Sequence, residues 1–166
     1  MAAPLRVEDV APFPDWQTAA HGALEFLHRI VGLDVWLVTH LEGEHQRVLD
    51  AHPRDQVLVG AVVPWDQSFC RKMVAGLGPR VATVTAAIPA YQGLVTPHPF
   101  SDRIAAYVGV PLVTHDLRVF GTLCGISARA QPRSLVRHLP TLEMTARLLS
   151  TLLPADSDLL PTVAGR

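Results

Sequence analysis

The sequence predicts an α/β domain of the α+β type, in which the terminal helices cover one face of a β-sheet and a short helix with a long loop covers the other. The order of the expected elements carries this prediction: helix, three strands, short helix, strand, long loop, two strands, helix. The last two strands are largely apolar on both faces, so the sheet needs a cover on each side. The 166 residues, of which 49% are hydrophobic, suffice for one domain with a full core.

The N-terminal half begins with an expected extended lead-in, residues 1–14, which contains three prolines. Asp15 can cap a helix that continues to Val31, because apolar residues recur at helical spacing from Trp16 onward and Gly32 follows where a helix end favours glycine. Runs of apolar residues, rich in β-branched side chains, then predict strands at residues 33–41, 46–51 and 56–65.

The C-terminal half is expected to contain a short helix, three further strands and a long helix. A long irregular segment, residues 85–103, separates two of these strands, and a loop of roughly twenty residues inside a compact domain is usually functional or lid-like. The expected elements are a helix at 68–77, strands at 80–84, 104–114 and 118–127, a helix at 134–153 and a frayed tail at 154–166.

Charge and composition argue against several function classes. The formal net charge of −1 provides no basic surface for nucleic acid. No run approaches the roughly 20 apolar residues of a membrane-spanning helix. The first residues lack the pattern of a signal peptide, so we expect a cytoplasmic protein with neither nucleic acid nor membrane as a partner. Two cysteines are too few for a disulfide framework, and the eight histidines show no metal-ligand spacing such as HExxH.

Four segments in combination carry a resemblance to a known family: SFCRKMVAG (68–76), IPAY (88–91), YVGVPL (107–112) and FGTLCGIS (120–127). The chain resembles the GAF domain over residues 15–153. The resemblance implies a six-stranded antiparallel sheet with a pocket opposite the terminal helices, roofed by the short helix and the long loop. Carried over to this sequence, it places the following residues near the pocket: Trp65, Ser68, Phe69, Cys70, Met73, Ile88, Tyr91, Tyr107 and Cys124.

The resemblance implies a non-enzymatic bacterial sensor that binds a small molecule and signals through helix-mediated dimerisation or a partner such as a histidine kinase or diguanylate cyclase. It leaves the ligand and any cofactor unknown. The chain lacks the cysteine–histidine pair of bilin-binding phytochromes and the Asn-Lys-Phe-Asp-Glu set of cyclic-nucleotide-binding members.

Two alternatives stay open: a GAF-fold free-methionine-sulfoxide reductase that uses Cys70 and Cys124, and a ligand-free dimerisation module. Because free cysteines are usually small buried hydrophobes, we expect both thiols to be structural.

Two further expectations concern packing. In the C-terminal helix the apolar residues Leu139, Leu142, Ala146, Leu149 and Leu153 are spaced 3 and 4 apart, which predicts a seam that packs against its counterpart or the N-terminal helix in a homodimer. The segment 85–103 is expected to close over an apolar cavity lined by the rings of Phe69, Tyr91 and Tyr107. Mutual contact of these three rings with no void between them would instead favour the interaction module.

Overall fold

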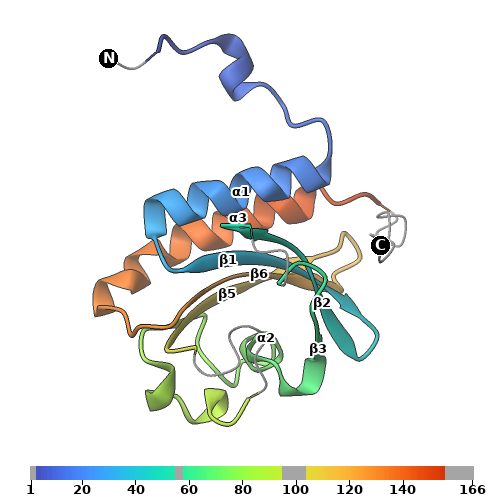
Figure 1. Ribbon diagram of the computed structural model, residues 1–166. Helices are drawn as coiled ribbons and strands as arrows, with labels where there is room; N and C mark the ends of the chain where they lie inside the picture. The colour runs from blue at the N-terminus through green and yellow to red at the C-terminus, as the bar shows by residue number, and fades with distance from the viewer. Residues whose placement is uncertain (1–2, 55–57, 95–103, 156–166) are drawn as a thin grey trace.

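The computed structural model describes residues 3–54, 58–94 and 104–155. Its centre is a six-stranded antiparallel sheet with the strand order β3-β2-β1-β6-β5-β4 (Figure 1). The predicted fold class is confirmed. The strands are β1 (Val35–Glu42), β2 (His45–His52), β3 (Val62–Pro64), β4 (Val81–Ala82), β5 (Ala106–Val113) and β6 (Val119–Ser127).

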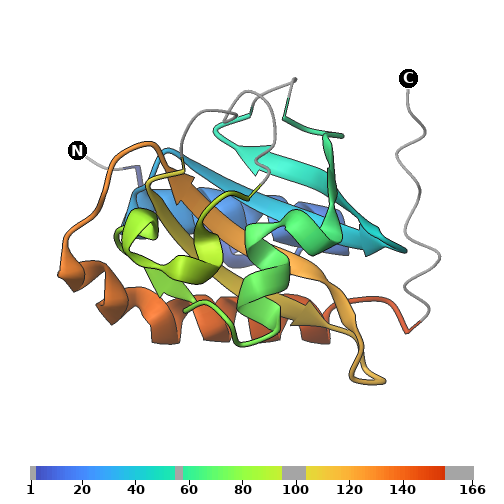
Figure 2. The same cartoon turned by 90° about the horizontal axis from the view of Figure 1, so that it is seen from below.

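Helices cover the sheet on both faces. The two long helices α1 (Trp16–Val31) and α3 (Leu139–Thr151) lie together on one face, as Figure 1 shows. The short helix α2 (Phe69–Val74) lies on the other face, and seen from below it runs across the strands (Figure 2). The 3-10 turns are η1 (Val7–Val10), η2 (Trp65–Gln67), η3 (Thr85–Ala87), η4 (Pro89–Tyr91) and η5 (Arg133–His138).

Local chemistry fixes the bounds of α1. The Asp15 carboxylate accepts a hydrogen bond from the backbone N–H of Thr18 at 2.7 Å, which satisfies one of the free donors at the helix start. Gly32 ends the helix at a φ of +87°, a conformation that costs glycine little. The indole N–H of Trp16 donates to the carbonyl of Leu149 in α3 at 2.9 Å, so the two long helices are joined at this point.

Alternation along the strands builds a core on each face of the sheet. In β1, Trp36 and Val38 pack with the long helices, whereas Val35 and Leu37 pack with α2. Successive side chains of a strand point to opposite faces, so a strand that is apolar at every position supplies both cores.

The predicted dimer seam of the C-terminal helix is wrong. Leu142, Ala146, Leu149 and Leu153 are at most 3% exposed and belong to the core between the helices and the sheet. A side chain buried within its own domain has no surface to offer a second copy. The large hydrophobic residues left exposed on α3 and at its end are Met144, Leu148 and Leu152, each more than half exposed.

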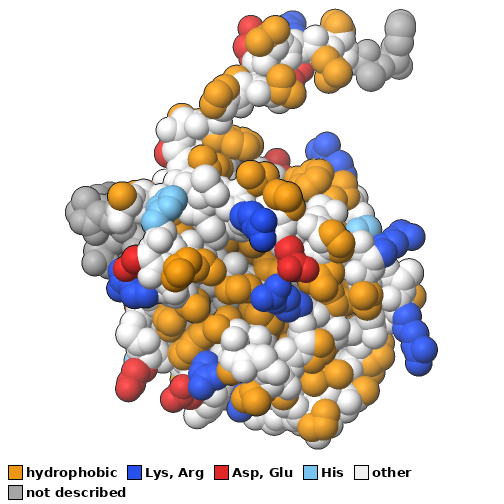
Figure 3. Space-filling model, turned by 180° about the vertical axis from the view of Figure 1, so that it is seen from behind, with side chains coloured by type: hydrophobic (Ala, Val, Ile, Leu, Met, Phe, Trp, Pro, Cys, Tyr) orange, Lys and Arg blue, Asp and Glu red, His pale blue; other side chains and the backbone are white. Residues whose placement is uncertain are grey.

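These exposed side chains lie on a mixed surface. Figure 3 views the molecule from behind, the side on which α3 lies, and shows hydrophobic side chains interspersed with charged ones. Arg80, before β4, forms an ion pair with Glu143 of α3 at 3.0 Å on this side. None of the helices in the described ranges is long and apolar enough to cross a membrane.

Several element bounds differ from those expected. The third strand begins at Val62 rather than residue 56, because the chain turns at 58–60 with a φ of +88° at Gly60. The C-terminal helix begins as the 3-10 turn η5 before α3. Residues 85–94 contain η3 and η4 rather than an irregular loop. Residues 56–57, 95–103 and 156–166, parts of the expected third strand, lid and tail, lie outside the described residues.

Candidate functional site

A small, partly open space lies between the sheet and α2. It offers about 40 Å³ to the centres of water-sized groups, where one water molecule needs on the order of 10–15 Å³ by the same measure. Its wall is almost wholly apolar. Five residues predicted from the sequence line it, Ser68, Phe69, Cys70, Tyr107 and Cys124, together with Leu37, Thr39, Gln46, Val48, Val63, Ile104 and Ile126.

The expected cavity between the rings of Phe69, Tyr91 and Tyr107 is not where the space lies. The ring centroid of Phe69 is 5.1 Å from that of Tyr91 and 5.4 Å from that of Tyr107, and the two tyrosine rings are 5.4 Å apart. The three rings therefore contact one another, the arrangement expected of the interaction module, and the prediction of a cavity lined by all three is wrong. A space opens instead beside Phe69 and Tyr107, against the sheet. Tyr91 does not line it: its hydroxyl donates to the carbonyl of Pro79, and Gly78 has no side chain that would collide with its ring.

The three other predicted residues also stand back from the space. Met73 of α2 is buried in the core on this side of the sheet, and Trp65 and Ile88 pack against that core with part of their surface exposed. They support the roof of the cavity and do not form its wall.

A buried chain of hydrogen bonds ends at the sulfur of Cys70. Thr122 Oγ1 donates to Cys70 Sγ at 3.1 Å, which uses the only proton of that hydroxyl. The proton of the 2.6 Å bond between Thr39 and Thr122 therefore belongs to Thr39. Gln46 Nε2 in turn donates to Thr39 Oγ1 at 2.8 Å and to Thr122 Oγ1 at 3.1 Å. The donors of the chain thus all run toward the thiol.

Tyr107 donates to the same sulfur from the other side, with 3.3 Å between Oη and Sγ. Its phenol can take this position because residue 109, two positions along β5, is glycine. A Cβ at Gly109 would lie 2.1 Å from the Tyr107 oxygen, far inside any real contact distance. The glycine of YVGVPL therefore leaves the space in which the Tyr107 ring reaches Cys70.

These donors separate the acidities of the two cysteines. Donation from Cys124, Thr122 and Tyr107 lowers the pKa of the Cys70 thiol against the opposing effect of burial. Hydrogen bonding with Cys70 and burial together raise the pKa of Cys124. Burial raises the pKa of Tyr107 well above its ordinary value, so this phenol keeps its proton. Cys70 is thus the group that can carry negative charge, and Cys124 is its adjacent neutral thiol.

The arrangement limits the chemistry of the cavity. Its described lining holds two thiols but no histidine and no charged side chain, so a metal or a zwitterion would find few partners there. The polar atoms of the hydrogen-bonded chain satisfy one another. What the space offers a ligand is mainly apolar surface beside one thiol.

Sequence reasoning missed Thr39, Gln46 and Thr122. The signal that could have found them is the pleat of the strands, because residues two apart share a face. Leu37 precedes Thr39, Val48 follows Gln46, and Cys124 follows Thr122 by two positions, so each polar residue lies on the face of a cavity-lining neighbour.

No protein-family model and no curated protein matches the sequence. Solved structures do match. The GAF domain of a phosphoenolpyruvate-protein phosphotransferase from Coxiella burnetii aligns at 13% identity with a TM-score of 0.66, covering 87% of this chain and 86% of that one. The chain has the GAF fold.

Two more matches show how differently this fold is used. The chromophore-binding domain of a bacteriophytochrome from R. palustris aligns at 16% identity and a TM-score of 0.59 over 83% of this chain, which spans 55% of that domain's length. A free methionine-R-sulfoxide reductase from Neisseria meningitidis, solved with its substrate, aligns at 19% identity and a TM-score of 0.65 over 91% of this chain and 84% of that one. The GAF fold therefore occurs both in sensory proteins and in a reductase, and a function must be argued from the site.

Proposed function

We propose that this chain is a cytoplasmic sensory domain that binds a small molecule in the space between the sheet and α2 and performs no chemistry on it. The observation that supports the proposal is the cavity itself. A well-packed interior leaves few voids larger than a water molecule, whereas this one has room for about three by the volume given above. The part of the ligand that enters is compact and apolar, because the wall is apolar and its polar neighbours are already paired.

The output of such a domain would pass through the two long helices. Their outward surface carries Phe26 and Ile30 from α1 and Met144, Leu148 and Leu152 from α3 and its end, all at least 40% exposed. Large exposed apolar side chains on this mixed surface are the feature that supports an interaction site. The partner we propose is a second copy of the chain, or an output protein such as a histidine kinase or a diguanylate cyclase.

Xenon tests the cavity directly, since a dry apolar cavity binds this atom. Val63→Phe places a larger side chain in the wall, and Val62→Phe is its matched control because Val62, the preceding residue of β3, is 46% exposed whereas Val63 is 4% exposed. We expect saturable xenon shifts in NMR spectra of the unaltered protein and of Val62→Phe, and none in Val63→Phe.

Native mass spectrometry of the three purified proteins then asks whether a small molecule co-purifies and whether Val63→Phe alone loses it. Absence of both xenon binding and a bound mass would contradict the sensor and leave the ligand-free interaction module.

The neighbouring thiols favour one second function, reduction of a sulfoxide. The Cys70 thiolate would attack the sulfoxide sulfur, the sulfoxide oxygen would take up one proton from water and pass to Cys70 as a sulfenic acid, and the sulfide would leave. Cys124 would then condense with the sulfenic acid to give a disulfide and water, and an external dithiol would restore both thiols. The lack of a charged group in the described lining weighs against an amino-acid substrate.

Turnover separates the two functions. Incubation with free methionine sulfoxide and dithiothreitol should give no methionine above the rate of a Cys70→Ser, Cys124→Ser double variant if the chain is a sensor. Methionine formation that either single substitution abolishes would establish the reductase in its place.

A further inference from the structure

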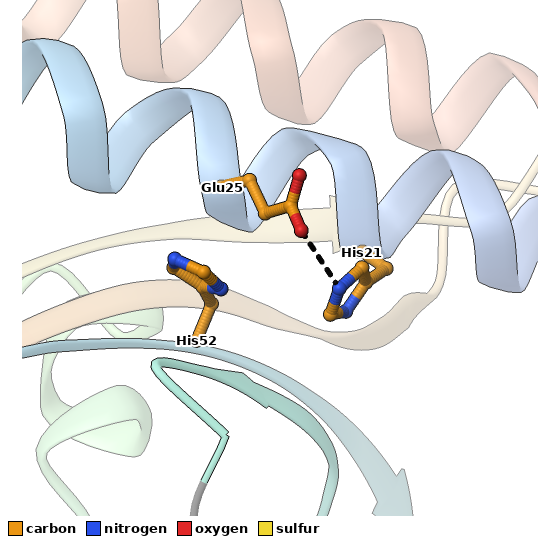
Figure 4. Close-up of side chains that lie close together, drawn as sticks. All are labelled: His21, Glu25 and His52. Carbon is orange, nitrogen blue, oxygen red and sulfur yellow. Dashed lines mark hydrogen bonds and ion pairs between the residues drawn. The ribbon is translucent and has the colours of Figure 1, made fainter.

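A second group of side chains lies on the opposite face of the sheet, where α1 packs against β2. His21 and Glu25 are four residues apart in α1 and therefore share one face of the helix. His52 ends β2 and reaches toward them, as Figure 4 shows. One ligand atom from each of the three residues lies within 4.8 Å of the other two.

A bulge in the sheet is what turns His52 toward the helix. The register between β1 and β2 shifts at Val38 and Thr39, which pair with Asp50 and Val48 and leave one extra residue, Leu49, in β2. An extra residue reverses the alternation of side chains beyond it. Val48 faces the cavity, whereas Asp50 contacts His21 on the helix side.

Asp50 holds the His21 ring in the orientation a metal ion requires. Its carboxylate lies 2.7 Å from Nδ1 of His21 and also accepts the backbone N–H of Ala51 at 2.9 Å. The remaining nitrogen, Nε2, lies 3.1 Å from the carboxylate of Glu25. A carboxylate on one ring nitrogen with the other nitrogen free for the ion is the usual second layer of a histidine–zinc site.

We propose that His21, Glu25 and His52 bind a divalent transition-metal ion, with Zn²⁺ as the preferred ion. Two imidazole nitrogens and one carboxylate oxygen suit Zn²⁺ and Co²⁺ and do not suit Mg²⁺ or Ca²⁺, which take oxygen ligands. Metal–ligand bonds of about 2.0–2.2 Å place neighbouring ligand atoms of a tetrahedral ion roughly 3.3–3.6 Å apart. In the structure, Nε2 of His21 lies 3.1 Å from the Glu25 carboxylate, and the three ligand atoms all lie within 4.8 Å of one another. These distances bracket the required spacing, so small rotations of the side chains suffice to coordinate an ion.

His52 distinguishes a metal site from an ion-pair network. A protonated His21 between Asp50 and Glu25 would explain those two contacts without any metal. That network gives no role to His52, whose ring lies 6.1 Å from that of His21 and 5.1 Å from that of His28 and makes no hydrogen bond among the described residues. The site is open to water, with side-chain exposures of 40% at His21 and 49% at Glu25, so an ion can enter and solvent can complete its coordination.

The test uses the untagged full chain, freed of metal with a chelator. Titration with CoCl₂ should give one saturable equivalent with a visible absorption spectrum of nitrogen and oxygen ligands. ZnCl₂ should displace the cobalt, and MgCl₂ should not. We expect His52→Ala to weaken Zn²⁺ binding at least tenfold by calorimetry, and Asp50→Asn to weaken it by about tenfold or more. His45→Ala, at the exposed start of the same strand, is the matched control and should bind as the unaltered protein does.

Circular dichroism checks that each variant is folded, and His52→Gln replaces His52→Ala if the latter is not. Binding that is lost in His52→Ala and retained in His45→Ala supports the site. Three results would overturn it: no saturable binding, equal affinity in His52→Ala, or an intense thiolate-to-cobalt band that Cys70→Ser removes. The last would move the metal to the cavity.

Discussion

Replacing Gly109 with alanine tests whether the position of Tyr107 is what organises the thiol site. The new Cβ would lie 2.1 Å from the Tyr107 oxygen and 2.6 Å from the ring carbon that bears it. Tyr107 is 1% exposed and packs against both Phe69 and Tyr91, so the ring has no free space to enter. The Tyr107 oxygen must move by about 1.3 Å to reach an ordinary contact distance of 3.4 Å, and this breaks its 3.3 Å bond to Cys70.

Three effects set the magnitude. Forcing extra volume into a packed core costs about 1–3 kcal/mol. The lost hydrogen bond costs roughly 1 kcal/mol. Alanine itself gains about 0.5–1 kcal/mol over glycine in a strand, because it restricts the unfolded chain. The first two effects outweigh the third, so Gly109→Ala should lower the free energy of unfolding by about 2 kcal/mol.

A matched substitution has the opposite expected sign. In α1, a Cβ at Gly22 would lie 2.7 Å from the ring of Phe13, nominally another severe clash. Phe13 is 55% exposed and can swing into solvent. The helical preference for alanine then prevails, and Gly22→Ala should be neutral or up to about 1 kcal/mol more stable.

Urea unfolding followed by tryptophan fluorescence measures both substitutions. Tyr107→Phe removes the nearest atom of the clash, so Gly109→Ala should cost less in a Tyr107→Phe background, with a coupling of about 0.5 kcal/mol or more. A Gly109→Ala protein with unchanged stability would refute the reasoning, because it would show that the phenol is not held where the structure places it.

Two further predictions concern the thiols and the helices. Because Cys124 and the neighbouring hydroxyls lower the pKa of Cys70 and the pKa of Cys124 is raised, iodoacetamide should label Cys70 first. Its labelling should level off at a lower pH than for an ordinary thiol of pKa about 8.5, and Thr122→Val should move that plateau to higher pH. Peptide mass spectrometry over a pH series checks this, and equal labelling of both cysteines would contradict it. Leu148→Glu, at a side chain 57% exposed, should leave stability within about 0.5 kcal/mol and abolish any dimer, whereas Leu149→Glu, at 3% exposed, should unfold the domain. Sedimentation and urea unfolding measure the two effects, and a monomeric unaltered protein would exclude the dimer.

The elements that sequence predicted well are those whose signal is local. The cap at Asp15 and the glycine at position 32 lie in the sequence itself, and they define the first helix to within a residue. The strands β5 and β6 were expected because apolar residues occupy both faces, and each was found within two residues of its expected bounds. Such signals do not depend on the rest of the fold.

The candidate site was predictable only in part, because its lining depends on contacts between distant segments. Cys70 and Tyr107 were expected near a pocket by resemblance, and both line the cavity. Tyr91 was expected beside them, but its ring packs behind Phe69, and this follows from the space left by Gly78, thirteen residues away. The 3–4 seam of the C-terminal helix has the same spacing whether it faces a sheet or a partner. Periodicity shows that a face is buried and does not show what buries it.

The bulge at Leu49 explains why spacing gave no sign of the histidine cluster. Strict alternation along β2 would place Gln46, Val48, Asp50 and His52 on one face of the sheet, all toward the cavity. With the extra residue, the first two stay at the cavity and the last two cross to the helix. Strand β2 thus contributes residues to the cavity on one face of the sheet and to the histidine cluster on the other. The bulge separates the residues of the two groups. An ion that pins His52 to α1 would hold the helix against the strand that forms one wall of the cavity. A cavity ligand that shifted β2 at His52 would alter the affinity of the proposed metal site, and linkage would then require the reverse effect to be of equal size.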